Sequence, residues 1–404
     1  MGAKLQNGCK AVNTGRTVLH VGKYFPPFKG GMENFVADLV RAQATWGPWR
    51  PVVLAHGRSG EDLEPWVRLV PTWGEVSHAP VSPGFPLALR SIIGRESPAL
   101  LHLHLPNTSA FWALILPCAR RLPWVVHWHA DVVPSRIDRR LAALYRTYRP
   151  MEQAVLRRAA AIVATSPDYL AGSEPLRGHR AKCHVVPLGM DPERLPPVNE
   201  LPMRRAQVLW GPGRPLRVLA VGRLSYYKGH DVLLRAAAQV PGCRVIIAGS
   251  GERRPALEKL MGALGVKHRV TLTGFLPDMD LWALMGSADV LCLPSLEKTE
   301  AFGVVLLEAL RYGLPVVASD IPESGVGWVV RRASCGVLVP PGNAQALARA
   351  LSHFSQDPLA LKALRSRMGK GFPRQFHIRY VAERLERVYA AAVTPSSRGD
   401  GKIA

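Results

Sequence analysis

Four charged side chains in the second half of the chain have the types and spacing to bind a phosphorylated ligand. Arg223 and Lys228 stand five positions apart in the segment GRLSYYKG, directly after an apolar run. A diphosphate carries about two negative charges, which an arginine and a lysine together can neutralise. The pair therefore predicts a diphosphate site, with a solvated basic loop as the other interpretation. The remaining two residues are Glu300 and Glu308, which are separated by seven residues.

The two glutamates are expected to meet one ligand from the two ends of a single segment. Glu300 and Glu308 enclose the apolar run AFGVVLL. Eight positions along a helix make about 2.2 turns, or roughly 12 Å. If the chain changes from loop to helix near Gly303, one carboxylate meets the ligand at each end. The amides of Phe302, Gly303 and Val304 would then point at that ligand from a helix N-terminus, where the helix dipole favours negative charge.

A second anion-binding position is expected near the start of the chain. Gly30 and Gly31 end the loop GKYFPPFKGG and precede an expected helix at about 32–44. Bare backbone amides at such a position can approach an anion closely, although a Gly-Gly pair before a helix is often only a turn. The loop matches neither GxGxxG nor a Walker loop, which argues against a nicotinamide enzyme or a P-loop ATPase.

These loops are expected to belong to two α/β units. Short apolar runs alternate with helix-like segments, which is typical of parallel sheets wound on both faces. Strands are expected at 17–21, 51–55, 100–105, 124–128, 161–165 and 183–187, and again at 216–221, 244–248, 269–272, 290–293, 316–318 and 336–339. Because open α/β sheets bind ligands at the carboxyl ends of their strands, we expect a site built from strand-to-helix loops of both units, at a shared cleft.

The chain of 404 residues exceeds what one hydrophobic core usually accommodates, so two domains are predicted. We expect an N-terminal domain at 17–189, a linker rich in proline and glycine at 190–215, and a second domain at 216–375. A C-terminal helix is expected at 376–393, and packing against the first domain is one option for it. Residues 1–16 and 394–404 are expected to be flexible tails.

The charge balance predicts a polyanionic partner. Lys and Arg number 52 against 30 Asp and Glu, a formal charge of +22, whereas the 48% hydrophobic content is that of an ordinary globular protein. Nucleic acid, acidic lipid and phosphorylated substrates all fit such an excess. No apolar run is long enough to cross a bilayer, the N-terminus lacks a signal core, and the cysteines are scattered. We therefore expect a cytoplasmic protein, peripheral at the inner face of the plasma membrane.

The basic segment at 136–158 is the expected membrane contact. It carries seven arginines interleaved with Leu and Tyr, so a helix would have an aromatic stripe beside a cationic face. The residues expected to contact a membrane or a lipid-linked acceptor are Arg139, Arg140, Arg146 and Arg149. A solvated helix that packs its stripe on its own core is an equal alternative, and Pro150 is expected to break or kink it.

Two patterns resemble metal sites but are interpreted otherwise. The HxH pairs His102/His104 and His127/His129 each share one strand face, yet they lack neighbouring cysteines or an HExxH arrangement. We expect His127 and His102 to be partly buried and only His129 to reach the cleft. The DMD string at 278–280 is expected to cap a helix, because Arg223 and Lys228 already supply the charge a metal would bring. No metal site is predicted.

In this order and combination, the motifs resemble the retaining GT-B glycosyltransferases of family 4, over about residues 17–390. That family has a Gly-Gly loop in its first domain. Its second domain has an Arg-x4-Lys pair and a Glu-x7-Glu motif before a Pro-Val-Val strand, which is 315–317 here. The resemblance implies two Rossmann-like, doubly wound domains that face an interdomain cleft, with acceptor binding in the first domain and nucleotide-sugar binding in the second.

The resemblance also implies roles for individual residues. Glu308 would bind the ribose hydroxyls of a nucleotide sugar, and Glu300 the hydroxyls of the transferred sugar. Arg223 and Lys228 would contact the diphosphate, and His129 of HWHAD lies where the family has an active-site histidine beside the reacting carbon. The other residues expected at the donor are Gly30, Gly31, Phe302, Gly303 and Val304.

The segments HWHAD, SPDYL and SYYKG also look like bacterial mannosyl- and rhamnosyltransferases. This implies a retaining hexosyltransferase that moves mannose or rhamnose from a nucleotide-diphosphate donor to a polyprenyl-diphosphate-linked saccharide, for lipopolysaccharide or exopolysaccharide. GDP-mannose is favoured over a UDP-sugar, and no metal or other cofactor is expected. Arg223 and Lys228 would assist diphosphate departure, the acceptor hydroxyl would attack from the same face, and the leaving phosphate would take its proton.

Two rival interpretations stay open. A nucleotide-sugar epimerase would use a similar two-domain fold. A non-enzymatic polyanion-binding protein would also explain the positive charge, but the basic residues are dispersed and no nucleic-acid module is recognisable, so nucleic acid is not expected as a partner.

Overall fold

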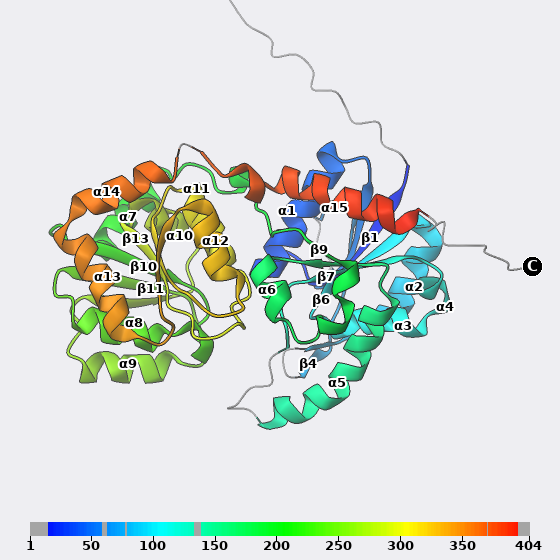
Figure 1. The fold of residues 1–404 in the computed structure, drawn as a ribbon, viewed down its shortest axis with the longest axis horizontal. Helices are drawn as coiled ribbons and strands as arrows, with labels where there is room; N and C mark the ends of the chain where they lie inside the picture. The colour runs from blue at the N-terminus through cyan, green and yellow to red at the C-terminus, as the bar shows by residue number, and fades with distance from the viewer. Residues whose placement is uncertain (1–14, 59–62, 77–78, 133–138, 370, 395–404) are drawn as a thin grey trace, which may run out of the picture. The chain divides into compact units, whose positions relative to one another are not determined.

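The computed structural model describes residues 15–58, 63–76, 79–132, 139–369 and 371–394. They form two compact units (Figure 1). Unit 1 comprises the chain up to residue 164, residues 174–189 and the chain from residue 378, and unit 2 comprises residues 165–173 and 190–377. The tail predictions for 1–14 and 395–404 lie outside the described residues.

Unit 1 is built on a parallel sheet of seven strands in the order β3-β2-β1-β6-β7-β8-β9. The strands are β1 (Thr17–Tyr24), β2 (Arg50–His56), β3 (Val67–Val70), β6 (Leu100–Leu105), β7 (Trp124–Trp128), β8 (Ala161–Ala164) and β9 (Cys183–Val185). A small antiparallel pair, β4 (Gly74–Val76) and β5 (Ala79–Val81), lies apart from this sheet. The helices are α1 (Gly31–Trp46), α2 (Phe85–Glu96), α3 (Trp112–Ile115), α4 (Pro117–Arg120), α5 (Arg139–Arg158) and α15 (Ile378–Val393), with 3-10 turns η1 (Thr108–Phe111) and η2 (Arg177–Lys182).

The last helix belongs to the first unit. Helix α15 packs beside α1 and over strands β6 and β7, as the red and blue helices of Figure 1 show. Its apolar side chains recur at helical spacing, and Leu385 and Tyr389 are fully buried. The ring of Tyr389 also meets Trp49 edge to face at 5.5 Å. Helices α1 and α15 thus cover one area of the unit 1 sheet together.

Unit 2 is built on a parallel sheet of six strands in the order β12-β11-β10-β13-β14-β15. The strands are β10 (Leu216–Val221), β11 (Cys243–Ala248), β12 (Val270–Gly274), β13 (Val290–Leu293), β14 (Val316–Ser319) and β15 (Gly336–Val339). The helices are α6 (Pro167–Gly172), α7 (Glu200–Trp210), α8 (His230–Ala238), α9 (Arg254–Ala263), α10 (Asp278–Ser287), α11 (Val304–Arg311), α12 (Gly325–Ala333), α13 (Ala344–Gln356) and α14 (Pro358–Arg367). Short 3-10 turns are η3 (Pro192–Arg194), η4 (Tyr226–Lys228) and η5 (Arg374–Phe376).

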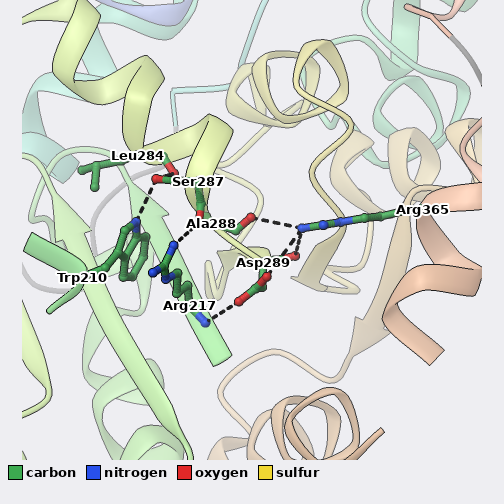
Figure 2. Close-up of polar contacts among 7 residues, drawn as sticks. All are labelled: Trp210, Arg217, Leu284, Ser287, Ala288, Asp289 and Arg365. Atoms are coloured by element: carbon green, nitrogen blue, oxygen red, sulfur yellow. Dashed lines mark hydrogen bonds and ion pairs between the residues drawn. The ribbon is translucent and has the colours of Figure 1, made fainter. Parts of the chain in front are cut away.

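The stretch 190–215, which its composition suggests is a linker, carries helix α7 and is folded into unit 2. Figure 2 shows how its end is fixed: the Trp210 indole Nε1 donates to Ser287 Oγ at 2.9 Å. The neighbouring backbone N–H of Arg217 donates to the Asp289 carboxylate at 2.9 Å, and Arg365 of α14 donates to the Ala288 carbonyl at 3.1 Å. Proline and glycine form the turns on both sides of α7. The composition of the whole stretch therefore resembles that of a linker, although its centre is helical.

The predicted fold class, two α/β units with parallel sheets, is confirmed. All twelve expected strands are present, with ends that differ by a few residues. Strand β3 was missed because Val67–Val70 is short and follows a proline-containing turn, and β4 and β5 are three residues each. Both sheets are all parallel, so their strands are buried on both faces and appear in the sequence as continuous apolar runs.

Candidate functional site

The centre of the unit 2 site is a buried ion pair. Lys228 Nζ lies 2.6 Å from Glu300 Oε2, and the two side chains are only 13% and 10% exposed. Ser295 Oγ donates to the same carboxylate oxygen at 3.1 Å, and Ser324 Oγ donates to the Glu300 main-chain oxygen at 2.5 Å. From the resemblance, Lys228 and Glu300 are expected to contact different parts of a ligand, whereas in the structure they bind each other.

The ion pair keeps the lysine charged. Burial alone would lower the pKa of Lys228, but the charge of Glu300 and its hydrogen bond raise that pKa above its ordinary value. The position depends on Gly222, which adopts φ +147° and whose missing side chain leaves room for the Lys228 ammonium: a Cβ there would lie 3.3 Å from Nζ. Lys228 therefore keeps its positive charge, and the Glu300 carboxylate that neutralises it is itself held by Ser295.

Arg223 lies in the same loop after β10 as Lys228, but its side chain pairs with a different carboxylate. Its side chain is 54% exposed, and its guanidinium lies 3.4 Å from Glu252 Oε2. The loop after β11 supports it, because Leu224 N–H donates to Ser250 O at 2.9 Å and Arg253 N–H donates to Leu224 O at 3.0 Å. The segment GSGE at 249–252 was missed by the sequence analysis, although glycines directly after a strand were its visible signal.

The helix expected near Gly303 begins at Val304. Gly303 is its N-cap residue with φ +73°, a left-handed conformation that favours glycine. Phe302 is buried and packs against the rings of Trp328 and Phe376, so its side chain is structural and only its backbone amide is a candidate for ligand binding. The positive end of the α11 dipole thus begins four residues after Glu300.

Glu308 lies on α11 and is 15% exposed, with its carboxylate 3.7 Å from the Arg194 guanidinium. Arg194 ends the turn η3, which is anchored where Arg311 Nε donates to Pro192 O at 2.8 Å. Arg194 is not among the residues predicted from the sequence, because it lies in the stretch interpreted as a linker. Glu308 and Glu300 each contact a cation, but each contacts a different one.

In unit 1, a carboxylate lies against the Gly-Gly pair. Gly31 begins α1 and Gly30 is its N-cap residue. A Cβ on Gly30 would overlap the Glu33 carboxylate, and burial raises the pKa of Glu33. Gly30 therefore makes room for an acidic side chain at the positive end of α1, which is a use that the sequence analysis did not foresee.

His129 belongs to a layer of five buried imidazoles, which we call the histidine layer: His20, His102, His104, His127 and His129. Each ring is at most 5% exposed. Burial lowers the pKa of every member, to about 4 for His20 and about 3 for His129, so all are neutral at pH 7. The expected burial of His127 and His102 is confirmed, and His129, which was expected to reach a cleft, is buried as well. Strand alternation places the rings on one face of β1, β6 and β7, with His129 directly after β7, and α1 and α15 cover that face.

The histidine layer is also where ring nitrogens lie close enough to bind a metal ion. The sets His20/His102/His104 and His104/His127/His129 each bring three nitrogens within 4.8 Å of one another. The DMD string has a different role. Asp278 and Asp280 form the first turn of α10, where Asp280 pairs with Arg205 of α7 at 2.6 Å.

Of the four arginines expected at a membrane, Arg146 is exposed, and Arg149 pairs with Glu174 at 2.5 Å. The side chains of Arg139 and Arg140, like the whole of Arg136, lie outside the part that the structure describes. Helix α5 continues through Pro150, so of the two expected outcomes, a break or a kink, the break does not occur. Its aromatic stripe packs in part on its own unit, since the rings of Tyr148 and Phe111 lie 5.1 Å apart. Among the described residues, no helix is long and apolar enough to cross a membrane.

Comparisons with known proteins agree on one class. Residues 29–194 match the model of glycosyltransferase family 4, and residues 207–373 match that of the glycosyl transferases group 1. The chain is 29% identical to a D-rhamnosyltransferase of Pseudomonas aeruginosa (84% of this chain, 87% of the relative). It is 28% identical to an O-antigen chain mannosyltransferase of Escherichia coli (67% and 68%) and 30% identical to an alpha-D-kanosaminyltransferase of Streptomyces kanamyceticus (76% and 79%).

Among solved structures, the Anabaena protein HepE in complex with UDP-glucose is similar to this chain with a TM-score of 0.73. The match covers 93% of this chain and 99% of HepE at 20% sequence identity. That likeness supports a common fold.

Proposed function

The chain belongs to the group 1 and family 4 glycosyltransferases, and we propose that it is a retaining enzyme of bacterial surface polysaccharide synthesis. It would transfer mannose or rhamnose from a nucleotide-diphosphate sugar to a polyprenyl-diphosphate-linked saccharide. The O-antigen mannosyltransferase and the D-rhamnosyltransferase among its relatives support this choice of sugars and of pathway. We keep GDP-mannose as the favoured donor, with UDP-sugars as the alternative that the HepE complex supports.

The observation that carries the proposal is the buried Lys228–Glu300 pair beside the start of α11. A diphosphate carries more negative charge than one carboxylate, so it competes with Glu300 for the Lys228 ammonium. Once displaced, the Glu300 carboxylate is free to accept hydrogen bonds from sugar hydroxyls. Donor binding would thus transfer the Lys228 charge from Glu300 to the diphosphate, and the Glu300 carboxylate would be held by hydrogen bonds from Ser295 and from the sugar hydroxyls.

In this proposal Lys228 and Arg223 bind the diphosphate and stabilise its charge as the bond to the sugar breaks. The amides at Gly303 and Val304 add the partial positive charge of a helix N-terminus, and Glu308 binds the ribose. The acceptor hydroxyl loses its proton to the leaving phosphate. No metal is required, because fixed cations take its place.

The experiment is a panel of nucleotide sugars tested for binding by thermal shift and for transfer to an undecaprenyl-diphosphate-linked sugar, with and without EDTA. We expect a guanosine-diphosphate sugar to raise Tm and to be consumed only with acceptor present. Strict dependence on added Mn²⁺ or Mg²⁺ would contradict metal-independent transfer. Epimerisation of the donor in the absence of any acceptor would instead support the epimerase interpretation.

We also propose that the enzyme docks on the anionic inner face of the plasma membrane through α5. Each cation near such a surface contributes about 1 kcal/mol. The variant Arg139→Gln/Arg146→Gln should therefore bind phosphatidylglycerol vesicles about thirtyfold more weakly. The charge-matched control Arg204→Gln/Lys259→Gln changes exposed residues of unit 2 and should bind as the wild type does. Equal loss in both variants would show that only net charge matters.

A further inference from the structure

The histidine layer contains a continuous line of hydrogen bonds that begins at a glutamine. Gln43 of α1 is 1% exposed, and its Oε1 lies 2.9 Å from His20 Nε2. His20 Nδ1 lies 3.1 Å from His104 Nε2, and His104 Nδ1 lies 3.0 Å from His129 Nε2. The line crosses from α1 over β1 and β6 to the end of β7, in the part of unit 1 where Figure 1 places α1 over the sheet.

Once the first acceptor of the line is fixed, the donor and the acceptor of every other hydrogen bond in the line are fixed as well. A neutral imidazole has one N–H donor and one bare nitrogen. The amide oxygen of Gln43 only accepts, so His20 donates from Nε2 and its Nδ1 is bare. His104 must then donate from Nε2 to His20, and His129 must donate from Nε2 to His104. The last ring of the line, His129, is left with a bare nitrogen at Nδ1.

The amide nitrogen of Gln43 fixes the tautomer of a fourth histidine. Its Nε2 donates to the Tyr389 hydroxyl at 3.3 Å, and that hydroxyl lies 2.7 Å from His102 Nδ1. Burial raises the pKa of Tyr389, so the hydroxyl keeps its proton and donates it to His102. One amide therefore sets the tautomers of four histidines, with Tyr389 as the link to His102.

We propose that Gln43 is a positioning residue that holds His129 in the Nε2–H tautomer and so presents a bare Nδ1, able to accept a hydrogen bond from a hydroxyl group. Within the described residues Nδ1 of His129 is buried and has no hydrogen-bond partner, so its capacity to accept a hydrogen bond is unused. The value of this acceptor for sugar transfer rests on the proposed function, but the tautomer itself does not.

The tautomer is measurable in the full-length protein. Two-bond ¹H–¹⁵N correlation spectra of the ¹⁵N-histidine-labelled protein distinguish protonated from bare ring nitrogens, and His129→Asn identifies the signals of that ring. We expect His129 to be protonated at Nε2 in the wild type. Protonation at Nδ1 would overturn the proposal without any variant being needed. Stoichiometric Zn²⁺ binding that removes these N–H groups would overturn it as well.

Three variants test the cause. Gln43→Met removes both amide functions, and we expect the ratio of the Nε2–H to the Nδ1–H form of His129 to fall roughly fivefold to tenfold, the effect of one neutral hydrogen bond. Gln43→Glu keeps an oxygen acceptor for His20 and should restore the wild-type tautomer. The control Tyr389→Phe removes the branch to His102 and should leave His129 unchanged. An unchanged ratio in Gln43→Met would show that Gln43 does not set the tautomer.

Activity measurements distinguish the effect of Gln43 on the His129 tautomer from its effect on sugar transfer. We expect Gln43→Met to lower kcat/KM by a factor similar to its loss of the Nε2–H form, with rescue in Gln43→Glu. If the tautomer shifts while activity does not, Gln43 sets the tautomer but has no part in turnover, and the use of Nδ1 in sugar transfer is overturned. If the wild type transfers no sugar from any donor, the proposed function fails while the NMR result stands by itself.

Discussion

Replacing one buried histidine should change how folding stability depends on pH. His127 is fully buried, burial holds its pKa well below 6.5, and neither ring nitrogen has a hydrogen-bond partner among the described residues. In the unfolded chain the same ring titrates at about 6.5. The folded state thus binds fewer protons, and the stability that His127 contributes is present above pH 6.5 and is lost as the pH falls toward its folded pKa.

The magnitude follows from that difference. Between pH 7.5 and 5.5, protonation of one such histidine in the unfolded state lowers the free energy of unfolding by about 1.4 kcal/mol. The variant His127→Phe cannot take up this proton, so its stability relative to the wild type should rise by about 1.4 kcal/mol over the same range. The difference between variant and wild type isolates His127. The wild-type slope also contains the other members of the histidine layer and the opposing contributions of Glu152 and Glu386 of unit 1, whose pKa values burial raises to about 8 and about 7.

The assay is urea unfolding of full-length wild type and variant at both pH values. Quenched amide exchange and mass spectrometry assign each transition to unit 1 or unit 2. The matched control is His268→Gln, at an exposed position of unit 2, which should leave the unfolding transition of unit 1 unchanged at both pH values. A stability difference for His127→Phe that is the same at pH 7.5 and 5.5 would refute the claim that the histidine layer is folded in its neutral form.

Three further predictions concern unit 2. Lys228→Met leaves the Glu300 carboxylate buried alone and should cost about 3–5 kcal/mol of stability, which Lys228→Met/Glu300→Gln recovers in urea unfolding while transfer remains lost. Recovery of activity in the double variant would mean that the pair is purely structural. Glu308→Gln should weaken donor binding by roughly 1.5–3 kcal/mol in titration calorimetry, and unchanged affinity would exclude the ribose role. Ser287→Ala leaves Trp210 Nε1 without its acceptor and should lower the free energy of unfolding by about 1–3 kcal/mol; an unchanged urea midpoint would mean that water replaces it.

The architecture was predictable because both sheets are parallel and buried. Runs such as Val290–Leu293 are apolar at every position, and glycine-containing loops separate them from helices. The loop-to-helix change at Gly303 was also readable, since a glycine before an apolar run supplies the left-handed conformation of an N-cap. Local chemistry therefore located the strands, and it located the start of the helix after Glu300.

Partners across the fold were not predictable in the same way. Arg194 and Glu308 are separated by 114 positions, and Gln43 and Tyr389 by 346. Which cation meets which carboxylate depends on how loops pack, and spacing along the sequence contains no such information. The composition of 190–215 misled for a related reason: proline and glycine report the turns that flank α7 but not the tertiary contacts of Trp210 that hold the helix in place.

Buried titratable groups are neutral in the histidine layer of unit 1 and charged at Lys228 of unit 2, and this difference has a chemical consequence. In unit 1 the histidine layer is neutral, so its imidazoles can donate and accept hydrogen bonds without attracting an anion. In unit 2 burial is combined with full charge, because Glu300 keeps Lys228 protonated. A leaving diphosphate needs cations, whereas a sugar hydroxyl needs a hydrogen-bond acceptor of defined direction, which a neutral imidazole with a bare nitrogen supplies. A protonated His129 would offer N–H at both ring nitrogens and could accept nothing, so the deep burial that keeps this histidine neutral is what preserves its capacity to bind a hydroxyl group.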